Sequence, residues 1–194
     1  WEEAVDDENG NYDYLMGADI DFDNPEVKDE LYRWGQWYLK MTGVNGFRLD
    51  AVKHIRAEFY PEWLGELRQN SERKLFSVGE YWSSNIDTIN HYLEKTNGCM
   101  SLFDVPLHYN FYRASISNGT YDMSQIFKGT IVGTNPDKAV TFVDNHDTGS
   151  TQQHWELSWY DVPAAYAFIL THPGMPCVAS QHYFAYSGDE NWQY

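Results

Sequence analysis

The sequence has few cysteines, few basic residues and no long apolar run. Its two cysteines, Cys99 and Cys177, exclude a disulfide scaffold, and no histidines stand near them at the spacing of a zinc site, so we interpret both as unpaired core thiols. The longest apolar stretch, residues 164–170, is far shorter than the roughly 20 residues of a membrane span. The 13 Lys and Arg are outnumbered by 29 Asp and Glu, and the formal charge of −16 disfavours nucleic acid and anionic membranes as partners.

The apolar content is nevertheless ample for a folded core. Hydrophobic residues make up 42% of the 194 residues and aromatic residues 17%, which excludes disorder and fits one domain of ordinary size. The chain opens at Trp1 with neither a methionine nor a signal peptide, so we expect it to be part of a longer protein.

Apolar periodicity predicts helices and strands in alternation. The clearest helix starts at the cap Asn24-Pro25, repeats apolar residues every three or four positions and stops at Gly43. Further helical stretches are expected at residues 52–69, 86–93, 124–127 and 163–170. Short apolar runs between them predict five strands, at residues 44–49, 75–78, 101–105, 139–143 and 176–179.

This alternation indicates an α/β fold with parallel strands and right-handed crossovers, either a doubly wound sheet or a (β/α)8 barrel. A nucleotide-binding sheet typically has a glycine-rich turn after its first strand, and neither GxGxxG nor GxxxxGK[ST] occurs here. The barrel is therefore favoured. Because five strands cannot close an eight-stranded barrel, we expect residues 24–194 to form its C-terminal part, about strands 4 to 8, entered through an acidic, loop-like stretch at residues 1–23.

Three of the expected strands end in a carboxylate, and in a barrel these ends meet at one rim. The three are Asp50, Glu80 and Asp147, and they are accompanied by Arg48, His146, Tyr81 and Trp82. Single acidic residues at strand ends are usually helix caps or solvated. Three at one rim, with a cation and aromatic residues beside them, indicate a chemical site.

Such a set suits glycoside cleavage. One carboxylate attacks the anomeric carbon while a second donates a proton to the leaving oxygen, and retaining enzymes hold the pair ~5–5.5 Å apart. Arg48 lies two residues before Asp50, on the same side of the strand, and is expected to keep Asp50 ionised. Glu80 would need a raised pKa, which apolar walls and a nearby anionic Asp50 or Asp147 could provide.

The motifs that carry these residues resemble a known family. GFRLDAVKHI (46–55), VGEYW (78–82) and FVDNHD (142–147) are similar to conserved regions two, three and four of the α-amylase family, glycoside hydrolase family 13, in the same order. NYDYLMGADIDFDNPEV (11–27) is similar to the end of domain B, which interrupts the family's barrel, so residues 1–23 are expected to belong to that inserted domain. Up to residue 147 the sequence resembles bacterial liquefying-type α-amylases, and DNHDTGSTQQHW (144–155) and ILTHPGMPC (169–177) resemble plant-type ones.

The resemblance implies a role for each matched residue. Asp50 would be the nucleophile, Glu80 the general acid and base, and Asp147 the carboxylate that holds the sugar hydroxyls and stabilises the transition state. The implied substrate contacts are Arg48, His146, Lys53, His54, Tyr81 and Trp82, with Lys53 and His54 on the leaving-group side and the two aromatic residues stacking on sugar faces.

Calcium is the cofactor that the resemblance implies. The acidic loop supplies hard oxygen donors of the kind that Ca²⁺ prefers, although such loops are more often simply solvated. In the family, ligands match Asp13, Asp19 and the backbone carbonyl of His54, and liquefying members have a further metal position that matches Asp21 and Glu2.

The expected activity is retaining endo-hydrolysis of α-1,4-glucosidic bonds in starch, glycogen or maltooligosaccharides. Two alternatives remain open, a 4-α-glucanotransferase of the same family and a non-catalytic glucan-binding or interaction protein. The resemblance further suggests a secreted, monomeric parent protein. The family's conserved region one, which carries a substrate-binding histidine, is absent from these residues.

Overall fold

The computed structural model describes residues 12–13, 17–18, 20–148 and 155–186. It contains two compact units, residues 1–82 with 87–101 and residues 83–86 with 102–194. The boundary between the inserted domain at residues 1–23 and the barrel from residue 24 onward stays a prediction.

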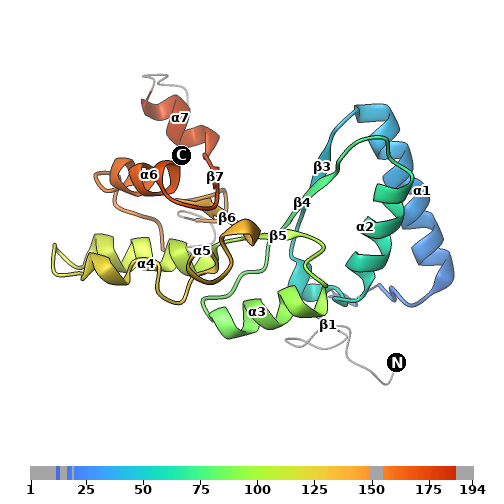
Figure 1. Ribbon diagram of the computed structural model, residues 1–194, viewed down its shortest axis with the longest axis horizontal. Helices are drawn as coiled ribbons and strands as arrows, with labels where there is room; N and C mark the ends of the chain where they lie inside the picture. The colour runs from blue at the N-terminus through green and yellow to red at the C-terminus, as the bar shows by residue number, and fades with distance from the viewer. Residues whose placement is uncertain (1–11, 14–16, 19, 149–154, 187–194) are drawn as a thin grey trace. The chain divides into compact units, whose positions relative to one another are not determined.

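In its described residues the first unit contains two short strand pairs and three α-helices. Figure 1 draws these helices from blue to green. Strands β1 (Tyr12–Asp13) and β2 (Gly17–Ala18) are antiparallel, whereas β3 (Gly46–Leu49) and β4 (Phe76–Gly79) are parallel. The helical elements are α1 (Pro25–Thr42), the 3-10 turn η1 (Val52–His54), α2 (Phe59–Gln69) and α3 (Ile86–Lys95).

Helix α1 begins and ends where its sequence signals predict. The Asn24 side chain accepts a hydrogen bond from the Glu26 amide, and Pro25 occupies the first turn, where no amide hydrogen is required. Gly43 ends the helix in the left-handed conformation with φ of 70°. Buried Gly35 allows close packing on α2, since a Cβ there would lie 3.0 Å from Leu67 Cδ2.

The helix expected at residues 52–69 was wrong in its first part. Residues 52–54 form a 3-10 turn, and the α-helix starts only at Phe59. The physical reason is that the chain here is held to the end of β4, because the Val52 amide donates to the Glu80 carbonyl at 3.0 Å.

The second unit holds β5 (Ser101–Phe103), which begins at its boundary, together with β6 (Ala139–Phe142) and β7 (Met175–Cys177). β6 pairs in parallel with both β5 and β7. The helical elements, drawn from green to red in Figure 1, are α4 (Val105–Ile116), η2 (Met123–Gln125), α5 (Ile131–Thr134), η3 (Pro136–Lys138), α6 (Val162–Thr171) and α7 (Ser180–Tyr186).

Three helices and the cysteine environments differ from expectation. α4, α5 and α7 were not predicted, and α4 begins at residue 105, which was interpreted as the end of a strand. The thiols are not in the core: Cys99 is half-buried, and Cys177 is exposed on β7, which in the described part pairs only with β6. Within the described ranges, no helix has the length and apolar character needed to cross a membrane.

Asp104 joins two elements of the second unit. Its side chain is fully buried and caps α4 by accepting from the Leu107 amide at 3.2 Å. It also accepts from the first two amides of α5, Ile131 at 3.1 Å and Val132 at 2.7 Å. One carboxylate therefore satisfies three buried backbone donors that belong to two helix N-termini.

We predict that Asp104→Ala lowers the free energy of unfolding by about 3 kcal/mol or more, since three buried amides lose their acceptor. Urea unfolding of the wild type and the variant measures the change. Asp122→Ala is the matched control, because Asp122 caps η2 through the Ser124 amide at an exposed site and should have a much smaller effect. Equal losses for the two variants would contradict the role assigned to Asp104.

Asp104 should also make stability depend on pH. Burial raises its pKa from 3.8 to about 6, against the opposing effect of the three amides. Because the folded pKa lies above the unfolded one, the stabilising contribution is complete below pH 3.8 and is lost as the pH rises through about 6. Asp104→Asn lacks this titrating group. The free energy of unfolding of the wild type should therefore fall relative to that of the variant as the pH rises from 3.8 to about 6, and the difference should be constant outside this range. Curves that run parallel at all pH values would refute the assignment.

Candidate active site

Two of the predicted carboxylates follow neighbouring parallel strands in the first unit. Register pairs Leu49 at the end of β3 with Gly79 at the end of β4, so Asp50 and Glu80 come directly after paired residues. The Glu80 amide donates to the Leu49 carbonyl at 2.9 Å, which continues the ladder to this point. The two strand ends that carry Asp50 and Glu80 therefore lie side by side, and the meeting of all three carboxylates stays a prediction.

Asp50 is presented to solvent rather than packed. Its side chain is 70% exposed and forms an ion pair with the Arg48 guanidinium, as the two-residue spacing predicts. An ion pair this exposed adds little to stability. Its effect is on orientation, because the guanidinium holds the carboxylate on one side of the strand.

Glu80 differs from Asp50 in being buried, with 8% of the residue exposed. Its Oε2 accepts a hydrogen bond from the Ala51 amide at 3.1 Å. Ala51 has a left-handed φ of 44°, unusual for a residue with a side chain, and this bend turns the chain from exposed Asp50 to buried Val52. One carboxylate is thus open and the other enclosed, with a single backbone bend connecting them.

The other predicted residues of this unit lie beside the same strand ends. Lys53 and His54 are in η1, and Lys53 Nζ is 3.5 Å from the Trp82 carbonyl. The Tyr81 ring packs against Tyr92 with 4.8 Å between ring centroids, so part of that ring is used in packing. The structure therefore brings Arg48, Asp50, Lys53, His54, Glu80, Tyr81 and Trp82 to the ends of two adjacent strands.

Asp147 lies in the second unit, in the turn that follows β6. The Asn145 side chain accepts from the amides of Asp147 at 2.9 Å and Thr148 at 3.2 Å, which closes the turn. His146 Nε2 is 3.2 Å from Asp147 Oδ2. Both residues lie in the turn after β6, and their meeting with Asp50 and Glu80 stays a prediction.

The predicted metal ligands are described only in part. Glu2 and Asp19 fall outside the described residues, and the side chain of Asp13, which lies in β1, is likewise not described. Asp21 forms a turn in which its Oδ1 accepts from the Asp23 amide at 2.9 Å. Among the described side chains, no group of three or more His, Cys, Asp or Glu is placed to hold a metal ion.

The turn at Asp21 is nevertheless fixed next to the segment that carries His54. Asp23 forms an ion pair with Arg56 at 2.9 Å, two residues after His54. The rings of Phe22 and Phe59 lie 4.9 Å apart. These contacts hold the turn at Asp21 beside the segment that carries His54.

Sequence reasoning missed three buried residues behind the Asp147 turn, namely His108, Asp144 and His182. Asp144 follows an apolar strand directly, and this position was the available signal. The two histidines come from α4 and α7, two of the helices that periodicity did not predict.

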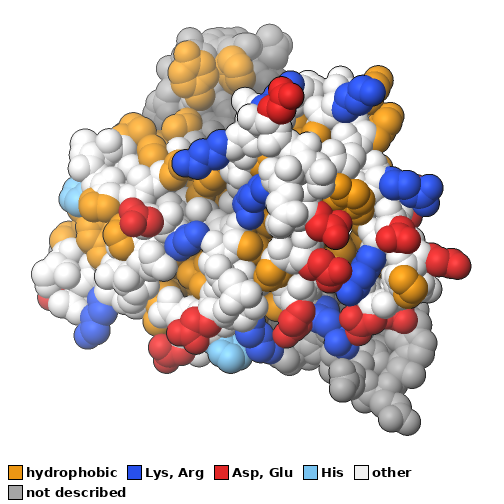
Figure 2. Space-filling view, turned by 45° about the vertical axis from the view of Figure 1, so that its right-hand side comes forward, with side chains coloured by type: hydrophobic (Ala, Val, Ile, Leu, Met, Phe, Trp, Pro, Cys, Tyr) orange, Lys and Arg blue, Asp and Glu red, His pale blue; other side chains and the backbone are white. Residues whose placement is uncertain are grey.

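The excess negative charge does not gather into one patch on the face shown in Figure 2, where Asp and Glu side chains alternate with Lys and Arg. Among the described residues, ion pairs such as Lys28–Glu62 and Arg33–Glu30 place opposite charges side by side.

Comparison with known proteins shows the family to which this chain belongs. The family model described as "Alpha amylase, catalytic domain" matches residues 1–191. The α-amylase of Geobacillus stearothermophilus is 54% identical over 187 residues, and the glucan 1,4-alpha-maltohexaosidase of Bacillus sp. (strain 707) is 49% identical over 187 residues. Each alignment covers 95% of this chain, but only 34% and 36% of the respective relative. The chain thus spans about a third of the length of these relatives.

A solved structure shows the same fold. The crystal structure of an Anoxybacillus α-amylase superposes with a TM-score of 0.71 at 22% identity, covering 88% of this chain and 39% of that one. With the parallel strands and intervening helices described above, this likeness shows that the chain is part of a (β/α)8 barrel.

Proposed function

Because the chain belongs to the alpha-amylase catalytic-domain family, we propose that its protein is a retaining endo-hydrolase of α-1,4-glucosidic bonds in starch, glycogen and related glucans. The observation that supports this proposal best is the placement of Asp50 and Glu80 after paired residues of two parallel strands, one exposed beside Arg48 and the other buried. Two carboxylates in contrasting environments are what double displacement at a sugar carbon requires.

In the proposed reaction, Asp50 attacks the anomeric carbon as the bond to the leaving oxygen breaks. Glu80 gives its proton to that oxygen, and a covalent glucosyl-enzyme ester forms on Asp50. Glu80, now a carboxylate, then takes a proton from water, whose oxygen attacks the same carbon and releases Asp50. The Arg48 guanidinium, which forms an ion pair with Asp50, holds that carboxylate on one side of the strand for the attack.

The remaining matched residues bind the glucan. Asp147, with His146 beside it, would hold the hydroxyls of the sugar that is cleaved. Lys53 and His54 would contact the leaving-group side, and Tyr81 and Trp82 would present aromatic faces to the apolar faces of the sugars.

We also propose that calcium binds where the acidic loop meets η1, through Asp13, Asp19 and the His54 carbonyl, with a further metal position at Asp21 and Glu2. The chemistry of this donor set fits, because carboxylates and a backbone carbonyl are hard oxygen ligands. The contacts of Asp23 with Arg56 and of Phe22 with Phe59 support it, since they hold the Asp21 turn to the segment after β3. When bound, the ion would tie the loop to the strand end that carries Asp50.

Activity provides the first test. In the full-length protein that contains this chain, Asp50→Asn should lower reducing-sugar release from soluble starch by about 10³-fold or more, because no nucleophile remains. Asp137→Asn, at an exposed position in η3, is the control and should retain wild-type activity. A wild-type protein that binds starch without releasing sugar would instead indicate a glucan-binding protein.

Product analysis separates hydrolysis from transfer. Incubation with a single maltooligosaccharide should give only shorter chains, since water resolves the covalent intermediate. Chromatography that detects chains longer than the starting one would show that a sugar hydroxyl acts in place of water, as in a 4-α-glucanotransferase.

Calcium removal should destabilise the protein. An ion at 100 times its dissociation constant stabilises the folded state by about 2.7 kcal/mol, so excess chelator should lower the melting temperature by several degrees. Calcium-saturated chelator is the control, and Asp21→Asn should reduce the difference between the two. An identical melting temperature in free and saturated chelator would reject the calcium site.

A further inference from the structure

The two oxygens of the Glu80 carboxyl group have different surroundings. The Ala51 N–H, in the peptide directly after Asp50, donates to Glu80 Oε2 at 3.1 Å. Among the described residues this is the one hydrogen bond of the Glu80 side chain, so Oε1 accepts from no donor there. One oxygen is therefore held by the backbone and the other is left for a different partner.

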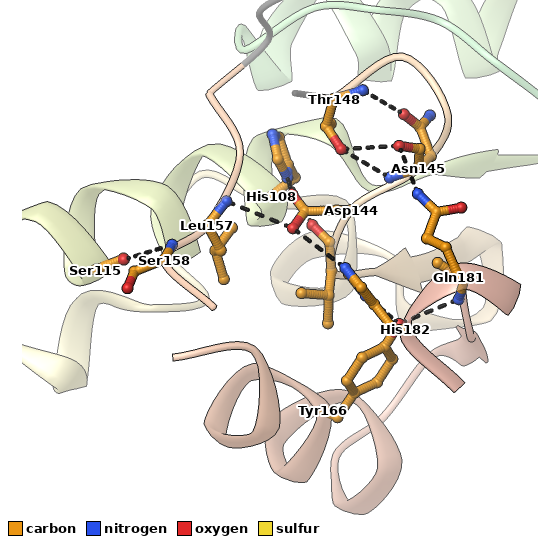
Figure 3. Close-up of polar contacts among 12 residues, drawn as sticks. His108, Ser115, Asp144, Asn145, Thr148, Leu157, Ser158, Tyr166, Gln181 and His182 are labelled. Carbon is orange, nitrogen blue, oxygen red and sulfur yellow. Dashed lines mark hydrogen bonds and ion pairs between the residues drawn. The ribbon is translucent and has the colours of Figure 1, made fainter. Parts of the chain in front are cut away.

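A second buried carboxylate shows how an unbonded oxygen can be sealed from solvent. Asp144 Oδ2 accepts from the Leu157 amide at 3.4 Å (Figure 3), and Asp144 Oδ1 is buried with no hydrogen-bond partner. Glu80 Oε1 is not sealed in this way, because Glu80 keeps 8% of its surface exposed and Oε1 is part of it. A molecule from solution can therefore reach Glu80 Oε1 but not Asp144 Oδ1.

The bonded oxygen determines where the acid proton of Glu80 is located. A protonated carboxyl group has one hydroxyl oxygen and one carbonyl oxygen, and a backbone N–H donates to the carbonyl oxygen. Because Oε2 is bonded to Ala51, we assign the proton to Oε1. The oxygen that carries the proton is thus the oxygen that solvent can reach.

The backbone conformation of Ala51 directs its N–H toward Glu80. The φ of 44° and ψ of 43° are left-handed, a conformation that residues with a side chain keep only where surrounding contacts impose it. Such contacts lie on both sides of Ala51. Fully buried Val52 donates its amide to the Glu80 carbonyl at 3.0 Å, and Asp50 is paired with Arg48.

The hydrogen bond from Ala51 gains strength as Glu80 loses its proton. Once the proton has left Oε1, Oε2 belongs to a carboxylate, and an N–H bonded to a carboxylate forms a hydrogen bond roughly twice as strong as a neutral one. An interaction that strengthens on the way to the transition state raises kcat. The Ala51 N–H therefore favours the donation of the proton as well as the orientation of the side chain.

We propose that Ala51 is a positioning residue for the general acid and base, because its N–H holds Glu80 Oε2 and leaves Oε1 to give and take the proton. In the first step the Oε1–H bond breaks and the hydrogen moves to the leaving oxygen. In the second step Oε1 takes a hydrogen from the attacking water, and the Ala51 N–H stays on Oε2 throughout. The part that concerns the reaction rests on the proposed function, whereas the hydrogen bond does not.

The first test measures the hydrogen bond without any activity, by NMR hydrogen exchange in the full-length protein. Glu80→Gln keeps a carbonyl oxygen for the Ala51 N–H, whereas Glu80→Met has a similar length and no such acceptor. The Ala51 amide should exchange about tenfold faster in Glu80→Met than in wild type, and Glu80→Gln should stay close to wild type. The Val52 amide, bonded to the Glu80 backbone carbonyl, is the internal control and should stay protected in all three. Equal exchange of Ala51 in wild type and Glu80→Met would overturn the proposal.

The second test separates proton donation from a purely structural role. Ala51→lactic acid, introduced by nonsense suppression, replaces the N–H by an ester oxygen and keeps the methyl group. The value of kcat/KM should fall about tenfold on maltopentaose, whose leaving alcohol needs the proton, and stay within about twofold on α-maltosyl fluoride, whose leaving fluoride does not.

Ala57→lactic acid is the matched control. Ala57 is also buried, and its amide donates to no acceptor in the described part of the chain, so this variant should match wild type on both substrates. Equal losses on both substrates in Ala51→lactic acid, or no loss on maltopentaose, would overturn the positioning role. If the wild type cleaves neither substrate, the proposed function fails, and hydrogen exchange still decides whether Ala51 holds Oε2.

Discussion

The hydrogen bonds between the ends of β3 and β4 are the constraint on which the first unit's site depends. Glu80 donates its amide to Leu49, accepts from Val52 at its carbonyl and accepts from Ala51 at its side chain. These three bonds fix where the chain leaves each strand, so they fix where both carboxylates stand. Without them the two strands could slip by a residue, and a slip of one residue moves every side chain to the opposite face.

The positions of Asp50 and Glu80 could be predicted from the sequence more completely than the helices and strands around them. Asp50 and Glu80 each follow a short apolar run, and parallel pairing brings such positions together whatever the exact strand bounds are. Helix α1 was equally clear, because Asn24 and Gly43 mark both its ends. Helix α4 was not predicted, although Asp104 and Pro106 form a typical helix start. The apolar residues before them favour a strand, and local patterns do not show where the strand ends and the helix begins.

The second unit contains two buried aspartates that are stabilised in different ways. Asp104 is surrounded by backbone amides of two helices, which no side-chain pattern in the sequence reveals. Asp144 faces side chains that lie 36 and 38 residues away from it in the chain, on α4 and α7. Both depend on long-range contacts, so the sequence shows the acids themselves and only the fold shows what surrounds them.

The left-handed bend at Ala51 has a consequence for the evolution of more heat-resistant forms. An alanine in this conformation costs the folded chain about 1–2 kcal/mol, which a glycine would avoid. A glycine would also loosen the peptide between the open carboxylate and the enclosed one. Relief of backbone strain and rigidity of the peptide between the two carboxylates therefore make opposing demands on this single position.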